Sequence, residues 1–153
     1  MLSERTNFER SIDAAMEEAR AGEADDHVED LATGAAKYCT PSYVAMEAGI
    51  SWIEFGQPDR AVETFENALA SWPATSQLRD RGLCLARLAT ASAASGDRER
   101  AIAAGTEALP VAHTTGSARI RTQLVEAYHR LLRLGISDEL AEFRHQLEAL
   151  STS

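Results

Sequence analysis

The sequence predicts an all-α fold, a right-handed superhelix of about eight helices that pair as antiparallel hairpins. Apolar residues recur at i, i+3, i+4 and i+7 along most of the chain, whereas no segment shows sustained alternation of β-branched residues. Alanine, the strongest helix former, supplies 28 of the 153 residues. Glycine and proline divide the chain at regular intervals. This length suits a single domain that folds without disulfides or metals.

Four helices are predicted in the first half of the chain, at residues 3–21, 26–39, 42–55 and 59–72. An apolar stripe from Phe8 to Ala19 identifies the first, and Gly22 separates it from the second. The third ends at the breaker Gly56-Gln57-Pro58, after which we expect Asp59 to cap the fourth. The fourth carries a stripe at Val62, Phe65, Leu69 and Trp72.

The second half predicts four more helices, at residues 76–95, 98–113, 116–134 and 138–150. Gly96 and Gly135 end two of them, and Asp97 and Ser137 are expected caps of the helices that follow. Short joints make consecutive helices antiparallel neighbours. We therefore predict one domain, 1–153, with helix pairs at about 3–39, 42–72, 76–113 and 116–150.

A repeat is clearest in the 34-residue unit 42–75, which places small, aromatic and proline residues at fixed positions: Ala45, Ala48, Gly49, Trp52, Gly56, Ala61, Phe65, Ala68 and Pro73. This arrangement resembles the tetratricopeptide repeat. Gly49 and Ala61 would let two helices approach closely, Trp52 and Phe65 would fill the space between them, and Pro73 would stop the second helix. Gly96, Ala101 and Ala108 repeat the spacing 40 residues later. Because this exceeds 34, the first helices of the third and fourth pairs are expected to be longer by about one turn.

A narrower resemblance covers residues 41–133. The strings 80–89 (DRGLCLARLA), 94–97 (ASGD), 101–109 (AIAAGTEAL) and 115–119 (TGSAR) are similar to the C-terminal repeat regions of actinobacterial helix-turn-helix regulators of the xenobiotic-response-element type. The resemblance implies a region that senses a ligand or partner and mediates self-association in transcription regulation. The chain would be either the sensor region of such a regulator or a free-standing relative whose function need not be transcriptional. Residues 1–40 differ from that family, because they are acidic and predict helices in place of a helix-turn-helix.

The charge distribution argues against direct nucleic-acid binding. The formal net charge is −9, and residues 1–76 alone carry 15 acids and 5 bases. An apolar leader and an apolar run long enough for a membrane span are both absent from the sequence, so we expect a cytoplasmic protein without a membrane partner. Cys39 and Cys84 are expected to be reduced, buried thiols.

Candidates for chemistry are sparse. The histidines His27, His113, His129 and His145 lack the sequence spacing of metal ligands. A nucleophilic cysteine would require the fold to bring Cys39 or Cys84 beside His113 or His129. The acidic run 23–30 lacks the spacing of a calcium loop and suits a helix start or a docking patch for a basic partner. We expect no enzyme, no catalytic residue, no cofactor and no metal.

The repeat resemblance implies a concave groove lined by the first helix of each pair. The positions that face it in the family correspond to Tyr43, Met46, Ile50, Ile53 and Glu54, then Leu83, Ala86, Thr90, Ala93 and Ala94, then Thr122, Val125, His129, Leu132 and Arg133. Arg87 is a further candidate. Such a surface suits a peptide, a protein segment or a small apolar ligand. Met46, Ile50 and Ile53 could instead simply pack on a neighbouring helix, or the same face could pair with a second copy of the chain.

Arginines form two rows on the predicted first helices of the last two pairs: Arg79, Arg81 and Arg87, then Arg119, Arg121, Arg130 and Arg133. They suit a solvated face, or a clamp for an anion where several converge. The functional expectation is a non-enzymatic binding domain that acts as a sensor or regulatory module. Its alternatives are a homodimerising scaffold and an accessory protein of a biosynthetic gene cluster.

Overall fold

The computed structural model describes residues 41–73 and 77–151, and this part of the chain is entirely helical, without a strand. Its helices are α3 (Pro41–Glu54), α4 (Pro58–Ala70), α5 (Leu78–Ala94), α6 (Arg98–Thr115), α7 (Ala118–Arg133) and α8 (Asp138–Ser151). The predicted all-α class is confirmed for these residues, and each helix begins and ends within two residues of its predicted bounds. The predicted helices 3–21 and 26–39 lie outside the described residues.

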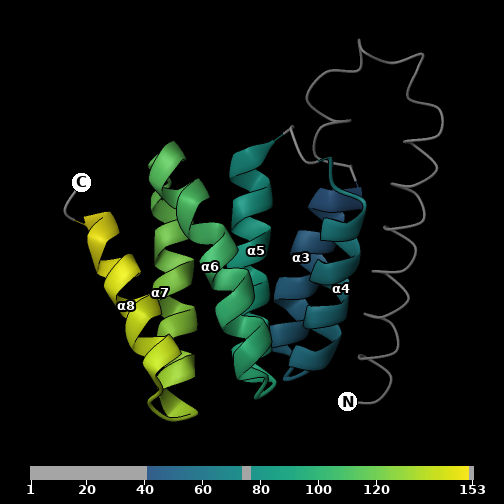
Figure 1. Ribbon diagram of the computed structural model, residues 1–153. Helices are drawn as coiled ribbons and strands as arrows, with labels where there is room; N and C mark the ends of the chain where they lie inside the picture. The colour runs from purple at the N-terminus through teal and green to yellow at the C-terminus, as the bar shows by residue number, and fades with distance from the viewer. Residues whose placement is uncertain (1–40, 74–76, 152–153) are drawn as a thin grey trace.

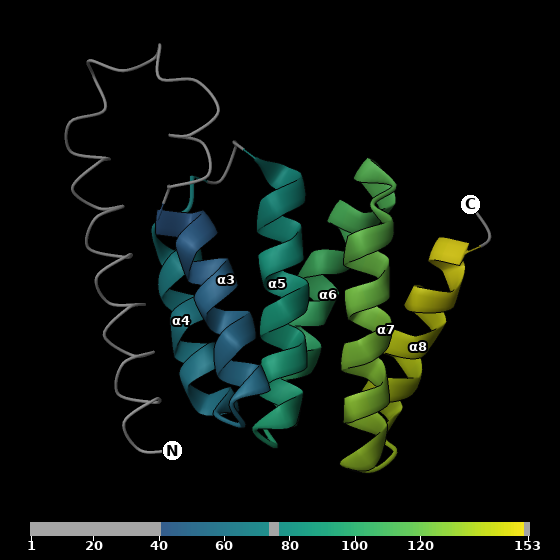
Figure 2. The ribbon, with the colours of Figure 1, turned by 180° about the vertical axis from the view of Figure 1, so that it is seen from behind.

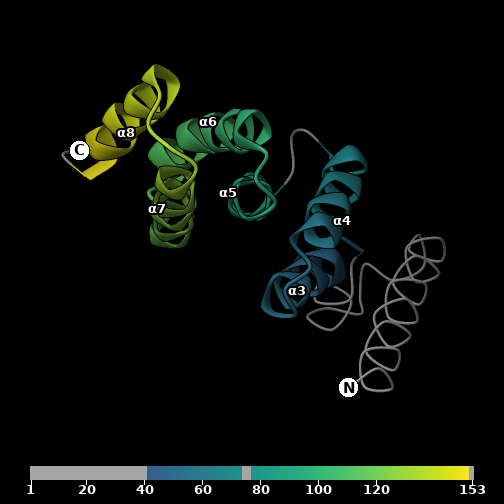
Figure 3. The same ribbon diagram turned by 90° about the horizontal axis from the view of Figure 1, so that it is seen from below.

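The helices form two layers of antiparallel neighbours (Figures 1 and 2). Figure 3 shows α3, α5 and α7 in one layer and α4, α6 and α8 in the other. Helix α5 lies in the middle and contacts α3, α4, α6 and α7. As a result, every residue of α5 from Gly82 to Ala93 is buried. The central helix is therefore part of the core along most of its length.

Close packing of α3 against α4 depends on a glycine. A Cβ atom at Gly49 would lie 2.3 Å from the Cε1 and Cζ atoms of Phe65, whose side chain is fully buried. Trp52, Ala61 and Ala68 are buried in the same cluster. The α4 helix ends at Ala70, and the exposed Pro73 follows three residues later. These residues place α3 and α4 at the short separation that small side chains allow.

Two further glycines play the same role between later helices. A Cβ at Gly82 of α5 would lie 2.5 Å from Val111 Cγ1 of α6, and one at Gly105 of α6 would lie 2.8 Å from Phe143 Cε2 of α8. Phe143 is 2% exposed and Val111 is half-buried. Close approach at a glycine therefore recurs along the array, with a large side chain from a neighbouring helix filling the space each time.

The helix starts confirm two expected caps and correct one. The Asp97 carboxylate accepts a hydrogen bond from the backbone N–H of Arg100 (3.2 Å), and the Ser137 hydroxyl accepts one from Leu140 (3.1 Å). Asp59 as a cap was wrong, because α4 already begins at Pro58 and its N-cap, Gln57, makes no side-chain cap. Asp59 lies instead in the first turn, where its charge still favours the helix dipole.

As expected, the first helices of the later hairpins are longer than α3, and α6 is in addition longer than α4, which the spacing did not predict. The first helices have 14 residues in α3, 17 in α5 and 16 in α7. The second helix grows more, from 13 residues in α4 to 18 in α6. Pro110 lies inside α6 without ending it, and the helix continues to Thr115.

Candidate binding groove

An open groove with a volume of about 1120 Å³ runs between α7 and α8. We call it the α7–α8 groove. Its lining comes from both helices: Arg121, Thr122, Gln123, Val125, Glu126, Tyr128, His129 and Leu132 of α7, and Arg144, Leu147, Glu148 and Ser151 of α8. This volume is slightly above the usual upper limit of about 1,000 Å³ for small-molecule sites.

The floor of the groove is apolar. Val125 and Leu132 are 36% and 40% exposed, although both are large hydrophobic side chains on one helix face. Tyr128 and Leu147 also line the groove, Tyr128 being half-buried and Leu147 buried. Exposed apolar side chains gathered in one groove mark a candidate interaction surface more strongly than the same residues scattered singly.

Charged side chains surround this floor. Arg144 Nε lies 2.9 Å from Glu148 Oε1, one turn away on α8, and this hydrogen bond raises the pKa of the Arg144 guanidinium. Arg130 and Glu126 form a similar pair at 3.1 Å on α7. Arg121 has no ion pair with another described residue. The rim of the groove therefore carries positive and negative side chains, and Arg121 is positioned there without an ion pair to a described residue.

Only the third set of predicted groove residues reaches this surface. Thr122, Val125, His129 and Leu132 line the groove, whereas Arg133 is exposed but lies outside its lining. The sequence had placed these residues on a concave face shared with α3 and α5. The structure gives them a neighbour that the sequence analysis did not use, the face of α8 that carries Arg144, Leu147 and Glu148.

The predicted residues of the central helix do not line an open groove. Leu83, Arg87 and Thr90, like Ala86 and Ala93 of the wider set, are buried, and Ala94 is half-buried. The physical reason is that α7 packs along α5 and covers this face. In α5, these side chains thus pack on neighbouring helices.

The first set is mixed. In α3, Tyr43 and Glu54 are exposed, Ile50 and Ile53 are half-buried, and Met46 is buried in the core cluster. The structure therefore does not join the three predicted sets into one continuous apolar groove.

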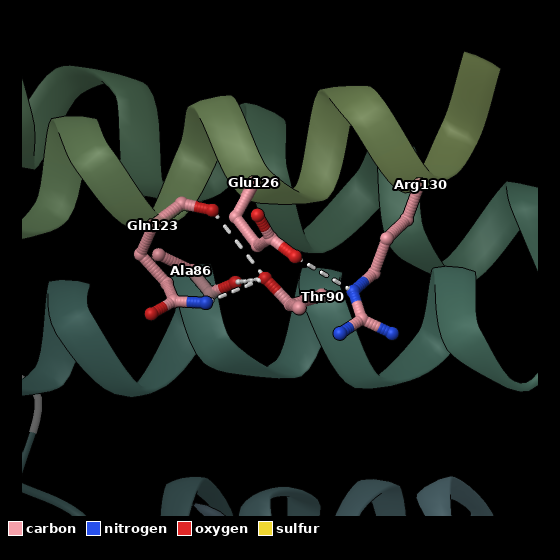
Figure 4. Close-up of polar contacts among 5 residues, drawn as sticks. All are labelled: Ala86, Thr90, Gln123, Glu126 and Arg130. Atoms are coloured by element: carbon pink, nitrogen blue, oxygen red, sulfur yellow. Dashed lines mark hydrogen bonds and ion pairs between the residues drawn. The ribbon is translucent and has the colours of Figure 1, made fainter. Parts of the chain in front are cut away.

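Hydrogen bonds join α5 to α7 at Thr90 and Gln123 (Figure 4). The Gln123 side-chain amide donates a hydrogen bond to the Thr90 hydroxyl (2.8 Å), and this hydroxyl lies 3.2 Å from the carbonyl oxygen of Ala86 and 3.3 Å from that of Gln123. Glu126 and Arg130 point toward the same side of α7 in the close-up. Thr90 is 2% exposed, so its hydroxyl is satisfied within the protein.

Cys84 is a core residue. Its side chain is fully buried, its Sγ donates to the Phe65 carbonyl at 3.9 Å, and burial raises the pKa of its thiol to about 12. A thiol so held is almost entirely protonated at neutral pH and makes a poor nucleophile. Cys39, His27 and the acidic run 23–30 lie outside the described residues.

Within residues 41–73 and 77–151, no group of three or more histidine, cysteine, aspartate or glutamate side chains is arranged to hold a metal ion. His113, His129 and His145 are exposed on three different helices. The six described helices include none that is long and apolar enough to cross a membrane.

The sequence analysis missed Tyr128, Arg144 and Leu147 as groove residues. A signal for them existed, because the predicted helix 138–150 follows 116–134 after a short joint and must lie beside it. The family positions used for the prediction describe only first helices, so the contribution of a second helix was not considered. Comparisons of the chain with protein-family models, with curated proteins and with solved structures gave no match.

Proposed function

We propose that this chain is a non-enzymatic, tetratricopeptide-like interaction domain whose α7–α8 groove binds an amphipathic helix of another protein. The observation that carries the proposal is the groove itself, with exposed Val125 and Leu132 on its floor. Helix-in-groove recognition uses such surfaces, with anchors of the partner at i, i+3 or i+4, and i+7.

The repeating arrangement supports a helical occupant. Helix α5 lies against the α3–α4 hairpin, mainly on α4, and α7 lies against the α5–α6 hairpin, mainly on α5 (Figure 3). One further step of this pattern puts a helix against α7 and α8, over the groove. A partner helix would therefore use the packing by which the described hairpins already associate.

The charged side chains on the rim of the groove indicate which charges the partner helix should carry. Because Arg144 and Glu126 are each paired on their own helix, they add little specificity. Arg121 has no such pair, and it lies near the beginning of α7. A matching helix would carry an apolar stripe and place an acidic residue at the end that faces Arg121.

The resemblance of residues 41–133 to sensor regions of helix-turn-helix regulators supports a regulatory role for this interaction, in transcription or in another cytoplasmic pathway. That support comes from the sequence alone.

A displayed library of helical peptides tests the proposal. Selection on the intact chain should enrich peptides with an apolar stripe, and their Kd is then measured by fluorescence anisotropy. Val125→Glu and Leu132→Glu should each weaken binding by about 30-fold, because a charge replaces an apolar anchor. Leu78→Glu is the matched control, since Leu78 is 49% exposed and outside the groove. Equal affinity for all four proteins would refute the assignment.

Self-association through the same groove is a second candidate, favoured by the presence of both charge signs on its rim. Sedimentation velocity at micromolar concentration distinguishes the two. A monomer excludes this candidate, whereas a dimer that Leu132→Glu dissociates supports it.

A further inference from the structure

Among the seven arginines of the predicted rows, three have ordinary partners in the structure. Arg79 donates to the Thr115 carbonyl (3.4 Å), Arg81 lies 3.9 Å from Glu107, and Arg130 pairs with Glu126. These contacts lie at exposed or partly exposed positions and suit solvated faces. Arg121 and Arg133 are exposed and make no ion pair with a described residue, as expected of a solvated face. Arg87 differs from all of these because it is buried.

Arg87 is a buried cation without a partner. Its side chain, on the central helix α5, is 8% exposed, and its Nη1 atom is buried without a hydrogen-bond acceptor. No carboxylate of the described residues lies within ion-pair distance of it. Arginine stays protonated in proteins, and an unpaired buried charge is strongly destabilising. A buried guanidinium N–H requires an acceptor, which water or a bound ligand can supply.

The groups around Arg87 come from the layer formed by α3, α5 and α7 (Figure 3). Burial lowers the pKa of the Arg87 guanidinium most, and the positive charge of Arg119 on α7 lowers it further. Glu47 on α3 acts in the opposite direction, and Tyr43 does so more weakly. Arg119 is exposed and makes no ion pair with the described residues. Thr90 and Gln123 are hydrogen-bonded across α5 and α7, so Arg87 and Arg119, each about one turn earlier, lie on facing stretches of the two helices. Neither arginine forms an ion pair with a described carboxylate.

We propose that Arg87 and Arg119 bind a carboxylate group at the face of α5 that lies between α3 and α7. The local charge argues for a monoanion: two guanidinium groups and the Glu47 carboxylate leave one net positive charge, which a carboxylate neutralises and a phosphate dianion would exceed. The planar guanidinium also matches a carboxylate in a bidentate arrangement. The exposed Tyr43 ring offers a contact for an apolar body attached to that carboxylate.

This site is separate from the α7–α8 groove. The groove lies on the side of α7 that faces α8, and none of Arg87, Arg119, Tyr43 or Glu47 lines it. The inference therefore stands or fails independently of the proposed helix binding. The carboxylate has two sources with the same chemistry, a small organic acid or the carboxyl terminus of a peptide.

Thermal denaturation and calorimetry of the intact chain test the site with sodium benzoate as the probe. Benzoate should raise Tm, whereas benzyl alcohol and sodium chloride at the same ionic strength should not. A short peptide with a free carboxyl terminus, compared with its amidated form, distinguishes the two sources. Preference for the small acid or for the free peptide supports the site in either case. A shift that benzyl alcohol or chloride reproduces would overturn it.

Variants link the effect to the two arginines. Arg119→Gln should weaken benzoate binding by about tenfold or more, because a charge-assisted hydrogen bond is lost. Arg87→Met should abolish binding while leaving the free protein at least as stable, since it removes the unpaired buried charge. Arg133→Gln, on the same helix, is the matched control and should bind normally. Should Arg87→Met not fold, Arg119→Gln alone decides, and undiminished binding by it contradicts the proposal.

Discussion

Replacing Gly49 with alanine tests how closely α3 and α4 approach. The new Cβ would lie 2.3 Å from two ring carbons of Phe65, whereas carbon atoms in contact are about 3.5–4.0 Å apart. The ring or the helix must therefore move by more than about 1 Å. Phe65 is fully buried, so the ring has no free space to move into.

Two effects of opposite sign set the magnitude. Overpacking a buried site costs about 1–3 kcal/mol, whereas alanine gains about 1 kcal/mol over glycine inside a helix. A contact this short places the overpacking cost at the upper end of its range. We therefore expect Gly49→Ala to lower the free energy of unfolding by about 1–2 kcal/mol, and Tm by roughly 3–6 °C.

Urea denaturation followed by circular dichroism measures this change. Phe65→Leu serves as the partner variant in a double-mutant cycle, because the smaller side chain relieves the contact. The double variant should lose less stability than the sum of the two single losses, with a coupling of at least about 0.5 kcal/mol. A Gly49→Ala protein as stable as the parent, or additive losses, would refute the close approach.

Three further predictions follow from single contacts. Arg98 Nη2 donates hydrogen bonds to the backbone carbonyls of Leu134 and Gly135 and thereby joins α6 to the end of α7. Arg98→Ala should therefore lower the free energy of unfolding, measured by urea titration, by about 1–2 kcal/mol, and an unchanged value would contradict these bonds. Thr90→Val should lower the free energy of unfolding by about 1–2 kcal/mol, because the Gln123 side-chain amide then loses its hydrogen-bond acceptor. The double variant Thr90→Val, Gln123→Leu should regain part of this stability, and a double variant no more stable than Thr90→Val would argue against the hydrogen bond. In a Cys39→Ser background, Cys84 should react with a disulfide reagent mainly after unfolding, because burial raises its thiol pKa to about 12 from 9.0 for a free thiol; rapid labelling of the native protein would contradict this burial. The contribution of Cys84 to folding stability should be present below pH 9.0 and should be lost as the pH rises toward about 12.

Helix positions could be predicted from the sequence because local signals agree with tertiary packing. The stripe at Phe65 and Leu69 and the breakers at Gly56 and Gly96 act over short stretches of chain. Gly56 and Gly96 have φ values of +73° and +83°, which favour glycine at a helix end. Most of the secondary structure of the described residues was thus predictable.

The exposure of the groove residues could not be predicted in the same way. Helix periodicity says that Leu83, Thr90 and Val125 share faces with other residues, but it does not say which faces another helix covers. Helix α5 is enclosed by its neighbours, whereas α7 has one side open toward α8. That difference depends on position in the array, and a repeat pattern treats both helices as equivalent.

Arg87 shows the limit of sequence reasoning at a single residue. In the sequence it is one arginine in a row that suggests a solvated face. The structure buries it, and the cause is the packing of α7 along α5. Long-range packing of this kind also determines which arginines remain without an acceptor.

Hydrogen–deuterium exchange in the presence of a selected helical peptide tests the central claim most directly, because it locates the bound surface on the intact chain. The α7–α8 groove predicts added protection in residues 121–132 of α7 and 144–151 of α8. Protection confined to α3 and α4, with exchange in α7 and α8 unchanged at saturating peptide, would contradict it.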